Sequence, residues 1–219
     1  MSDVRDQIAA VTRRLELRLR HGRDARVLVA RRAFDAPAAE VWDAITDRDR
    51  IPRWFLPVSG ELRVGGHYQL EGNANGVIER CRTPRLLTIT WEYAGEVSWL
   101  EVTLSSGPAG MTILELTHII PVDDDRWGHF GPGAIGIGWD LTLLGLDRYL
   151  SKDTSATPPE PMTWMDSDEG RAFMTLSGEQ WCAASVASGA DEQAATLAAA
   201  RCLAAYTGSP QDDDARRAR

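Results

Sequence analysis

The order of the periodic segments between residues 27 and 150 limits the fold of this chain more than any single motif. Residues 27–34 are rich in branched side chains, which predicts a first strand. Pro37 then favours a helix start, because its missing N–H costs nothing in a first turn. A second short helix is expected to end at Trp54 and Phe55. Several strand-like runs and a glycine-opened helix over residues 131–150 follow, which indicates a cupped antiparallel sheet that grips a late helix.

The middle of the chain has a hydrophobic period of two, which is typical of half-buried antiparallel strands. In residues 87–93 the apolar side chains alternate with threonine and glutamate. Residues 112–118 alternate in the same way, with His118 on the face of Leu116. Residues 61–70 are predicted to form two strands that turn at Gly65 and Gly66.

Both ends of the chain are predicted to be helical. An apolar stripe at helical spacing predicts an N-terminal amphipathic helix, formed by Val4, Ile8, Val11, Leu15 and Leu19. Further helices are expected over residues 167–187 and 191–206, the second capped by Asp191, and the tail after them is expected to be disordered. The predicted divisions are an N-terminal helix (1–24), a core domain (25–152), a helical extension (153–208) and a disordered tail (209–219).

Composition excludes several functional classes. The net charge of −8 disfavours nucleic acid as the main partner, because phosphate neutralisation needs a basic face. The three cysteines are widely spaced and predict reduced thiols rather than disulfides or a zinc site. We expect a cytoplasmic protein without a membrane span, because residues 1–10 do not form a signal peptide and no apolar run is long enough. No cofactor or metal motif is present; the glycines at 133, 136 and 138 are interpreted as close packing or cavity space.

A cavity between the sheet and the late helix is the predicted ligand site, since ligand pockets are concave and mostly apolar. Tryptophan and tyrosine supply large rigid surfaces that suit flat ligands. The candidate lining residues come from both elements: Trp42, Trp54, Phe55, Tyr68, Leu70, Trp91, Tyr93, Leu116, His118, Ile135 and Trp139.

Among the polar candidates, His118 is the one that could act as an acid or base. The alternative is a core histidine that is hydrogen-bonded to a neighbour. Asp140 is either a desolvated carboxylate or a surface charge, and Glu79 is expected to pair with an arginine. The acidic run at residues 123–125 is interpreted as a solvated turn rather than a cation site.

These residues together resemble the SRPBCC superfamily, the START-like and birch-pollen-allergen-like helix-grip group. Within it, the pattern is most similar to bacterial domains like the activator of HSP-90 ATPase. The segments that carry the resemblance are residues 34–37, Val41–Trp42, Trp54–Phe55, Gly65–Gly66, residues 76–80 and 83–86, Trp91 and the strand ending in His118. It covers residues 27–150 and implies an α+β helix-grip fold, with the extra terminal helices outside it.

The resemblance implies three functions that the residues do not separate. The first is binding of a small hydrophobic or aromatic molecule in the cavity. The second is a polyketide-cyclase-like enzyme, a cyclase, dehydratase or hydrolase with His118 as acid or base. The third is a chaperone-associated interaction module, in which the terminal helices meet a protein partner. Separately, the apolar stripes of the terminal helices predict a homodimer, because the stripes otherwise need covering by the single domain.

Overall fold

The computed structural model describes residues 3–151 and 161–208, which divide into two compact units. Within the described residues, the sheet unit comprises residues 10–122 and 141–151. The helical unit comprises residues 3–9, 123–140 and 161–208. The boundary falls inside helix α4 (Gly133–Leu150), so each unit contains one half of this helix.

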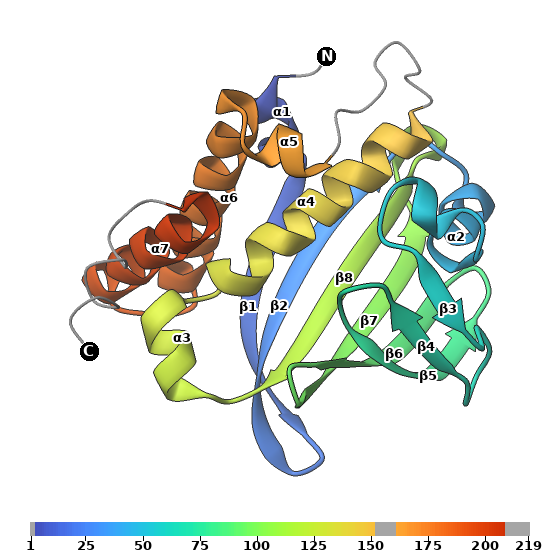
Figure 1. The fold of residues 1–219 in the computed structure, drawn as a ribbon, viewed down its shortest axis with the longest axis horizontal. Helices are drawn as coiled ribbons and strands as arrows, with labels where there is room; N and C mark the ends of the chain where they lie inside the picture. Colours follow the sequence, from blue (N-terminus) through green and yellow to red (C-terminus); the bar gives the residue numbers. More distant parts are fainter. Residues whose placement is uncertain (1–2, 152–160, 209–219) are drawn as a thin grey trace. The chain divides into compact units, whose positions relative to one another are not determined.

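Antiparallel strands form one sheet in the sheet unit (Figure 1). Within the described residues it has eight strands in the order β1-β2-β8-β7-β6-β5-β4-β3. Their bounds are β1 (Val11–Arg20), β2 (Arg23–Phe34), β3 (Val58–Gly60), β4 (His67–Leu70), β5 (Asn75–Arg82), β6 (Leu86–Tyr93), β7 (Glu96–Ser106) and β8 (Thr112–Pro121). This curved antiparallel sheet with its late helix confirms the predicted α+β helix-grip fold.

One face of the sheet packs against the second half of α4. Arg32 on β2 is buried and its Nη2 lies 2.7 Å from Oδ2 of Asp147 on α4, which identifies that face. Paired residues of antiparallel strands share a face, so Leu28, which pairs with His118, lies on the same side. We call this the helix-facing face. Its buried apolar residues include Ala30, Phe34, Leu100, Val102, Leu104, Leu114 and Leu116.

The opposite face has a small core of its own. Ala25, Val27, Val29 and Ile119 are buried there, with Trp99 packed against them. The guanidinium of Arg20, at the end of edge strand β1, lies 5.0 Å from the centre of the Trp99 ring on β7. The same side chain lies 3.3 Å from Glu79 on β5. Because β1 and β5 are far apart in the strand order, the end of the β1–β2 hairpin curls over this face.

Two short helices complete the sheet unit. Pro37 occupies the N-cap position of α2 (Ala38–Thr46), as its backbone preference favours, and η1 (Ile51–Arg53) follows. Trp54 is fixed by its indole N–H, which donates to the carbonyl of Ala44 at 2.9 Å. A Cβ at Gly145 on α4 would lie 2.8 Å from the carbonyl oxygen of Trp54, so only glycine allows this close approach.

The helical unit is built around a helical hairpin. It contains α1 (Val4–Ala9), α3 (Asp124–Phe130), the first half of α4, α5 (Pro161–Met165), α6 (Asp168–Ala187) and α7 (Glu192–Thr207). Ser167 caps α6 by accepting from the N–H of Gly170, and Asp191 caps α7 by accepting from that of Ala194. The predicted Asp191 cap is therefore confirmed, and so is the helix over residues 168–187.

Trp181 on α6 is the centre of the helical core and is fully buried. It lies over Gly136 of α4, where an added Cβ would be 2.3 Å from the indole. Its N–H donates to Oδ2 of Asp140 at 3.1 Å, and the Ser177 hydroxyl donates to the same oxygen at 2.5 Å. The glycine of α4 and this buried carboxylate therefore join the first half of α4 to α6.

The predicted N-terminal helix over residues 1–24 is wrong beyond Ala9. Residues 11–20 form strand β1, which pairs with β2 along its whole length. Leu15 and Leu19 are four residues apart and fit a helical stripe, but together with Leu17 they also fit a period of two. Backbone pairing with β2 over residues 11–20 decides in favour of the strand. The strand predicted at residues 27–34 begins earlier, at Arg23, and is the second strand rather than the first.

Two other predictions need correction. Residues 61–66 are not a strand, because the N–H of Gly66 bonds to the carbonyl of Arg63 in a tight turn and only β4 follows. The acidic run after β8 begins a helix rather than a loop, since Asp123 accepts from the N–H of Arg126 and caps α3. The predicted linker after Ser151 and the disordered tail lie outside the described residues.

Candidate functional site

His118 lies in the middle of the helix-facing face, as its strand parity predicted. It pairs with Leu28 on β2 and Leu100 on β7, so apolar neighbours flank it on both sides. Its side chain is buried, with 4% of its surface exposed. The ring lies in edge contact with Trp91 on β6, with 6.2 Å between the ring centres.

The hydrogen bonds of Ser98 indicate which ring nitrogen of His118 carries a hydrogen. The Ser98 hydroxyl donates its one hydrogen to the carbonyl of Trp91 at 3.1 Å. The Nε2 atom of His118 lies 2.8 Å from the same hydroxyl oxygen and must therefore donate to it. Burial lowers the pKa of His118 to about 3, so the ring is neutral at physiological pH. The alternative of a core histidine bonded to a neighbour describes this geometry.

The aromatic residues of β6 and β4 lie at graded depths. Trp91 is half-buried, and Tyr93, two residues further along the same face, is 54% exposed. Tyr68 is buried, and its hydroxyl donates to the carbonyl of Thr90 at 2.7 Å. Burial, and then the charge of Glu92, raise the pKa of Tyr68 well above its usual value. Tyr68 therefore acts as a neutral hydrogen-bond donor inside the sheet.

The remaining predicted lining residues of the sheet unit have structural partners. Trp42 and Leu70 are buried in the core, and Leu116 lies beside His118 on β8. Trp54 and Phe55 are half-buried and stack with their ring centres 5.6 Å apart. These residues pack within the sheet unit. Trp91 and His118 are predicted lining residues from two different strands that the structure brings into direct contact.

The last two predicted lining residues belong to the helical unit. Ile135 is half-buried and Trp139 is buried, both on the first half of α4. The predicted cavity between the sheet and the late helix stays a prediction.

The surface prediction for Asp140 fails in the structure, whereas the prediction for Glu79 is confirmed. The surface position considered for Asp140 is wrong, because the carboxylate is 1% exposed and accepts from Ser177 and Trp181. Its position on α4, one residue after a tryptophan in an apolar stripe, did not indicate which helix it meets. The expected arginine partner of Glu79 is confirmed as Arg20.

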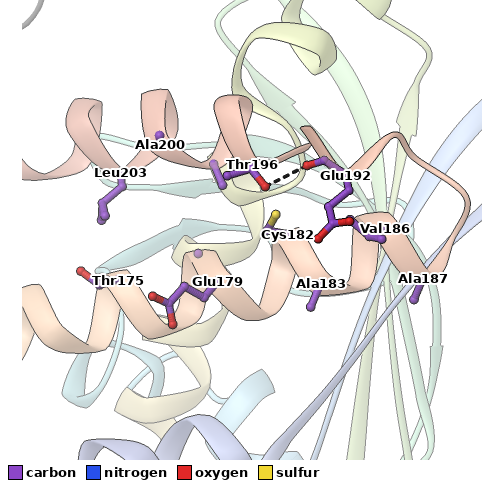
Figure 2. Close-up of a pocket in the computed structure, with 12 residues that line it drawn as sticks. Thr175, Glu179, Cys182, Ala183, Val186, Ala187, Glu192, Thr196, Ala200 and Leu203 are labelled. Carbon is purple, nitrogen blue, oxygen red and sulfur yellow. Dashed lines mark hydrogen bonds between the residues drawn. The ribbon is translucent and has the colours of Figure 1, made fainter. Parts of the chain in front are cut away.

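A groove between α6 and α7 was missed by the sequence reasoning (Figure 2). It has a volume of about 650 Å³ and is lined by Thr175, Gly178, Glu179, Cys182, Ala183, Val186, Ala187, Glu192, Thr196, Ala199, Ala200 and Leu203. The signal that could have found it is the alanine-rich sequence of α7, which is apolar on more than one side.

The described residues contain neither a candidate metal site nor a candidate membrane span. In residues 3–151 and 161–208, no group of three or more histidine, cysteine or acidic residues could hold a metal ion. Among the helices that the structure describes, none is both long and apolar enough to cross a membrane.

A curved antiparallel sheet that packs against a late helix defines a helix-grip protein. Residues 35–151, more than half of the chain, match the family described as "Activator of Hsp90 ATPase homolog 1-like protein". The chain belongs to this family, as the resemblance to the SRPBCC superfamily implied. The sequence matches no curated protein.

Similar solved structures extend beyond that segment. The crystal structure of CalU16 from Micromonospora echinospora is 35% identical and covers 80% of this chain and 98% of its own, with a TM-score of 0.65. Its solution NMR structure gives 35% identity, 82% and 97% coverage and a TM-score of 0.66. EF2215 from Enterococcus faecalis, a conserved protein of unknown function, is 18% identical with 83% and 95% coverage and a TM-score of 0.58. The last similarity concerns the fold alone.

Proposed function

We propose that this chain binds a small hydrophobic or aromatic molecule against the helix-facing face of its sheet unit. The observation that carries the proposal is the contact between half-buried Trp91 and buried, neutral His118. Trp91 presents a large rigid ring, and Tyr93 beside it is exposed on the same face. Family membership and the fold are consistent with such a site but do not specify the ligand.

The electrostatics of this face favour an uncharged ligand. The His118 ring is uncharged at neutral pH, and its Nε2–H already donates to the hydroxyl of Ser98. An apolar ligand placed against Trp91 would therefore meet an uncharged imidazole. At about 25 cal/mol per Å², covering roughly 200 Å² of apolar surface contributes about 5 kcal/mol before the entropy of association is subtracted.

An enzymatic role for His118 is less well supported. Ser98 supplies the second polar group that acid–base catalysis would need. However, a general acid or base works best when its pKa lies near the working pH. A pKa of about 3 leaves His118 without a proton to give at pH 7 and makes it a weak base. Binding is therefore the better explanation of this residue.

The test combines native mass spectrometry with a fluorescent probe. Native spectra of the purified chain would reveal a co-purifying apolar molecule. Binding of the uncharged fluorescent probe N-phenyl-1-naphthylamine would then be titrated in Trp91→Leu and in the matched control Trp99→Leu, which alters the opposite face. We expect Trp91→Leu to weaken probe binding about fivefold, a loss of about 1 kcal/mol, and the control to change it about twofold or less. Equal effects of the two variants would contradict the proposed site.

A further inference from the structure

Helix α7 has more apolar surface than its own buried face accounts for. Residues 194–205 read Ala-Ala-Thr-Leu-Ala-Ala-Ala-Arg-Cys-Leu-Ala-Ala, in which Arg201 is the one charged residue. A helix on the surface of a globular protein normally has a single apolar stripe. In α7 that stripe is represented by Ala198 and Cys202, which are buried, whereas Leu197 is 50% exposed.

Helix α6 likewise has a second face. Trp181 and Ser177 turn toward the core of the helical unit, where they contact Asp140. Gly178, Cys182 and Val186 lie about one third of a turn away from that face, and they line the groove (Figure 2). The hairpin therefore presents one side to its own core and forms an apolar groove on another.

The dimensions of the groove suit a helix. Its α6 wall runs from Thr175 to Ala187, which at about 1.5 Å per residue is about 18 Å, or three helical turns. Several lining side chains are glycine or alanine, among them Gly178, Ala199 and Ala200. Small side chains allow the axis of a third helix to approach to about 8–10 Å.

The charge of the groove indicates the chemistry of its occupant. The charged residues among its lining are two carboxylates, Glu179 on α6 and Glu192 on α7, and both are exposed. A second copy of the chain placed around a two-fold axis would bring these carboxylates together, in a protein that already has a net charge of −8. A basic partner would instead be attracted to them.

We propose that the α6–α7 groove docks an amphipathic helix of a partner protein. The docked helix has about three turns, apolar residues on one face, and lysine or arginine where it meets Glu179 and Glu192. This site is distinct from the ligand site on the sheet unit. The expected arrangement is a three-helix layer in which the partner covers the apolar residues of α7 that line the groove, Ala199, Ala200 and Leu203.

Cys182 is a built-in reporter for this groove. It is half-buried and lines the groove. Cys202 is buried, and burial raises its pKa to about 11, so Cys202 reacts slowly at neutral pH. Replacing exposed Cys81 by serine leaves Cys182 as the reactive thiol of the full chain. The probe is a synthetic peptide of about three helical turns with leucine at helical spacing and lysine on the flanks. Its control has the same composition with the leucines dispersed.

We expect the saturating peptide, but not its dispersed control, to slow the reaction of Cys182 with a disulfide reagent about fivefold, because the bound helix covers the thiol. Glu179→Lys with Glu192→Lys should weaken peptide binding at least about tenfold, since two ion pairs of about 0.7 kcal/mol each are lost and like charges replace them. The matched control is Glu71→Lys, an exposed acid in the sheet unit, which should leave binding within about twofold.

Three results would overturn the proposal. The first is an unchanged reaction rate of Cys182 with saturating peptide. The second is an equal loss of binding in the Glu71→Lys control, which would indicate general attraction to an acidic chain. The third is a chain that sediments as a dimer with Cys182 already protected, which would identify a second copy as the occupant.

Discussion

Buried His118 should make the stability of the sheet unit depend on pH in a way that can be calculated. Burial lowers the pKa of this residue from 6.5 to about 3, so the unfolded chain binds a proton that the folded chain excludes. The stabilisation is fully present above pH 6.5 and is lost as the pH falls from 6.5 towards 3. Each pH unit within this window costs about 1.4 kcal/mol, so the loss between pH 7.5 and pH 4.5 is about 2.7 kcal/mol.

The variant His118→Gln isolates this contribution. Glutamine keeps a donor for Ser98 but has no proton to gain, so carboxylates titrate in both chains and their contribution cancels in the difference. We expect the free energy of urea unfolding to fall about 2.7 kcal/mol further in the wild type than in the variant over this pH range. His67→Gln, which removes an exposed imidazole, is the control and should follow the wild type. Parallel pH dependences in the wild type and His118→Gln would refute the argument that burial holds this ring neutral.

Two further predictions concern α4. Gly136→Ala should destabilise the helical unit by about 1–3 kcal/mol, because its Cβ would lie 2.3 Å from the Trp181 indole. Gly138→Ala is the control: its Cβ would lie 3.7 Å from the nearest atom, so it should be neutral or stabilising by up to about 1 kcal/mol. Thermal unfolding compares the two variants, and equal effects would contradict the close packing of Trp181 over Gly136. Asp147→Ala should lower the free energy of urea unfolding of the sheet unit by about 3 kcal/mol, because buried Arg32 loses its anionic partner. A decrease below about 1 kcal/mol would contradict this and mean that water replaces the carboxylate.

The sequence correctly predicted the elements whose hydrophobic pattern fits either a helix or a strand but not both. The Asp191 cap and the helix after it were placed correctly because an acidic residue before an alanine-rich run is a strong start signal. The alternation in residues 112–118 correctly placed His118 beside Leu116. Residues 11–20 were assigned to a helix because leucines four residues apart fit both periods, and the pairing with β2 that decides between them is not local.

For the candidate site, the sequence predicted which residues share a face of the sheet but not which hydrogen bonds they make. Strand parity indicated that Trp91 and His118 share a face, but not that the Ser98 hydroxyl links them. The burial of Asp140 could not be predicted because its donors, Ser177 and Trp181, come from a helix about forty residues further along the chain. Such contacts depend on how helices dock, and composition or spacing does not report this.

The glycines of α4 connect these observations to the family assignment. Residues 35–151, which match the family, include the whole of α4, yet only its second half packs within the sheet unit. In the second half, Gly145 allows the backbone of Trp54 to approach α4 closely. In the first half, Gly136 leaves room for the indole of Trp181, which lies on α6. A side chain at Gly136 would therefore disturb the attachment of the extension while leaving the contacts of Gly145 intact. Ligand binding near Trp91 should then survive Gly136→Ala, whereas peptide binding to the α6–α7 groove should weaken.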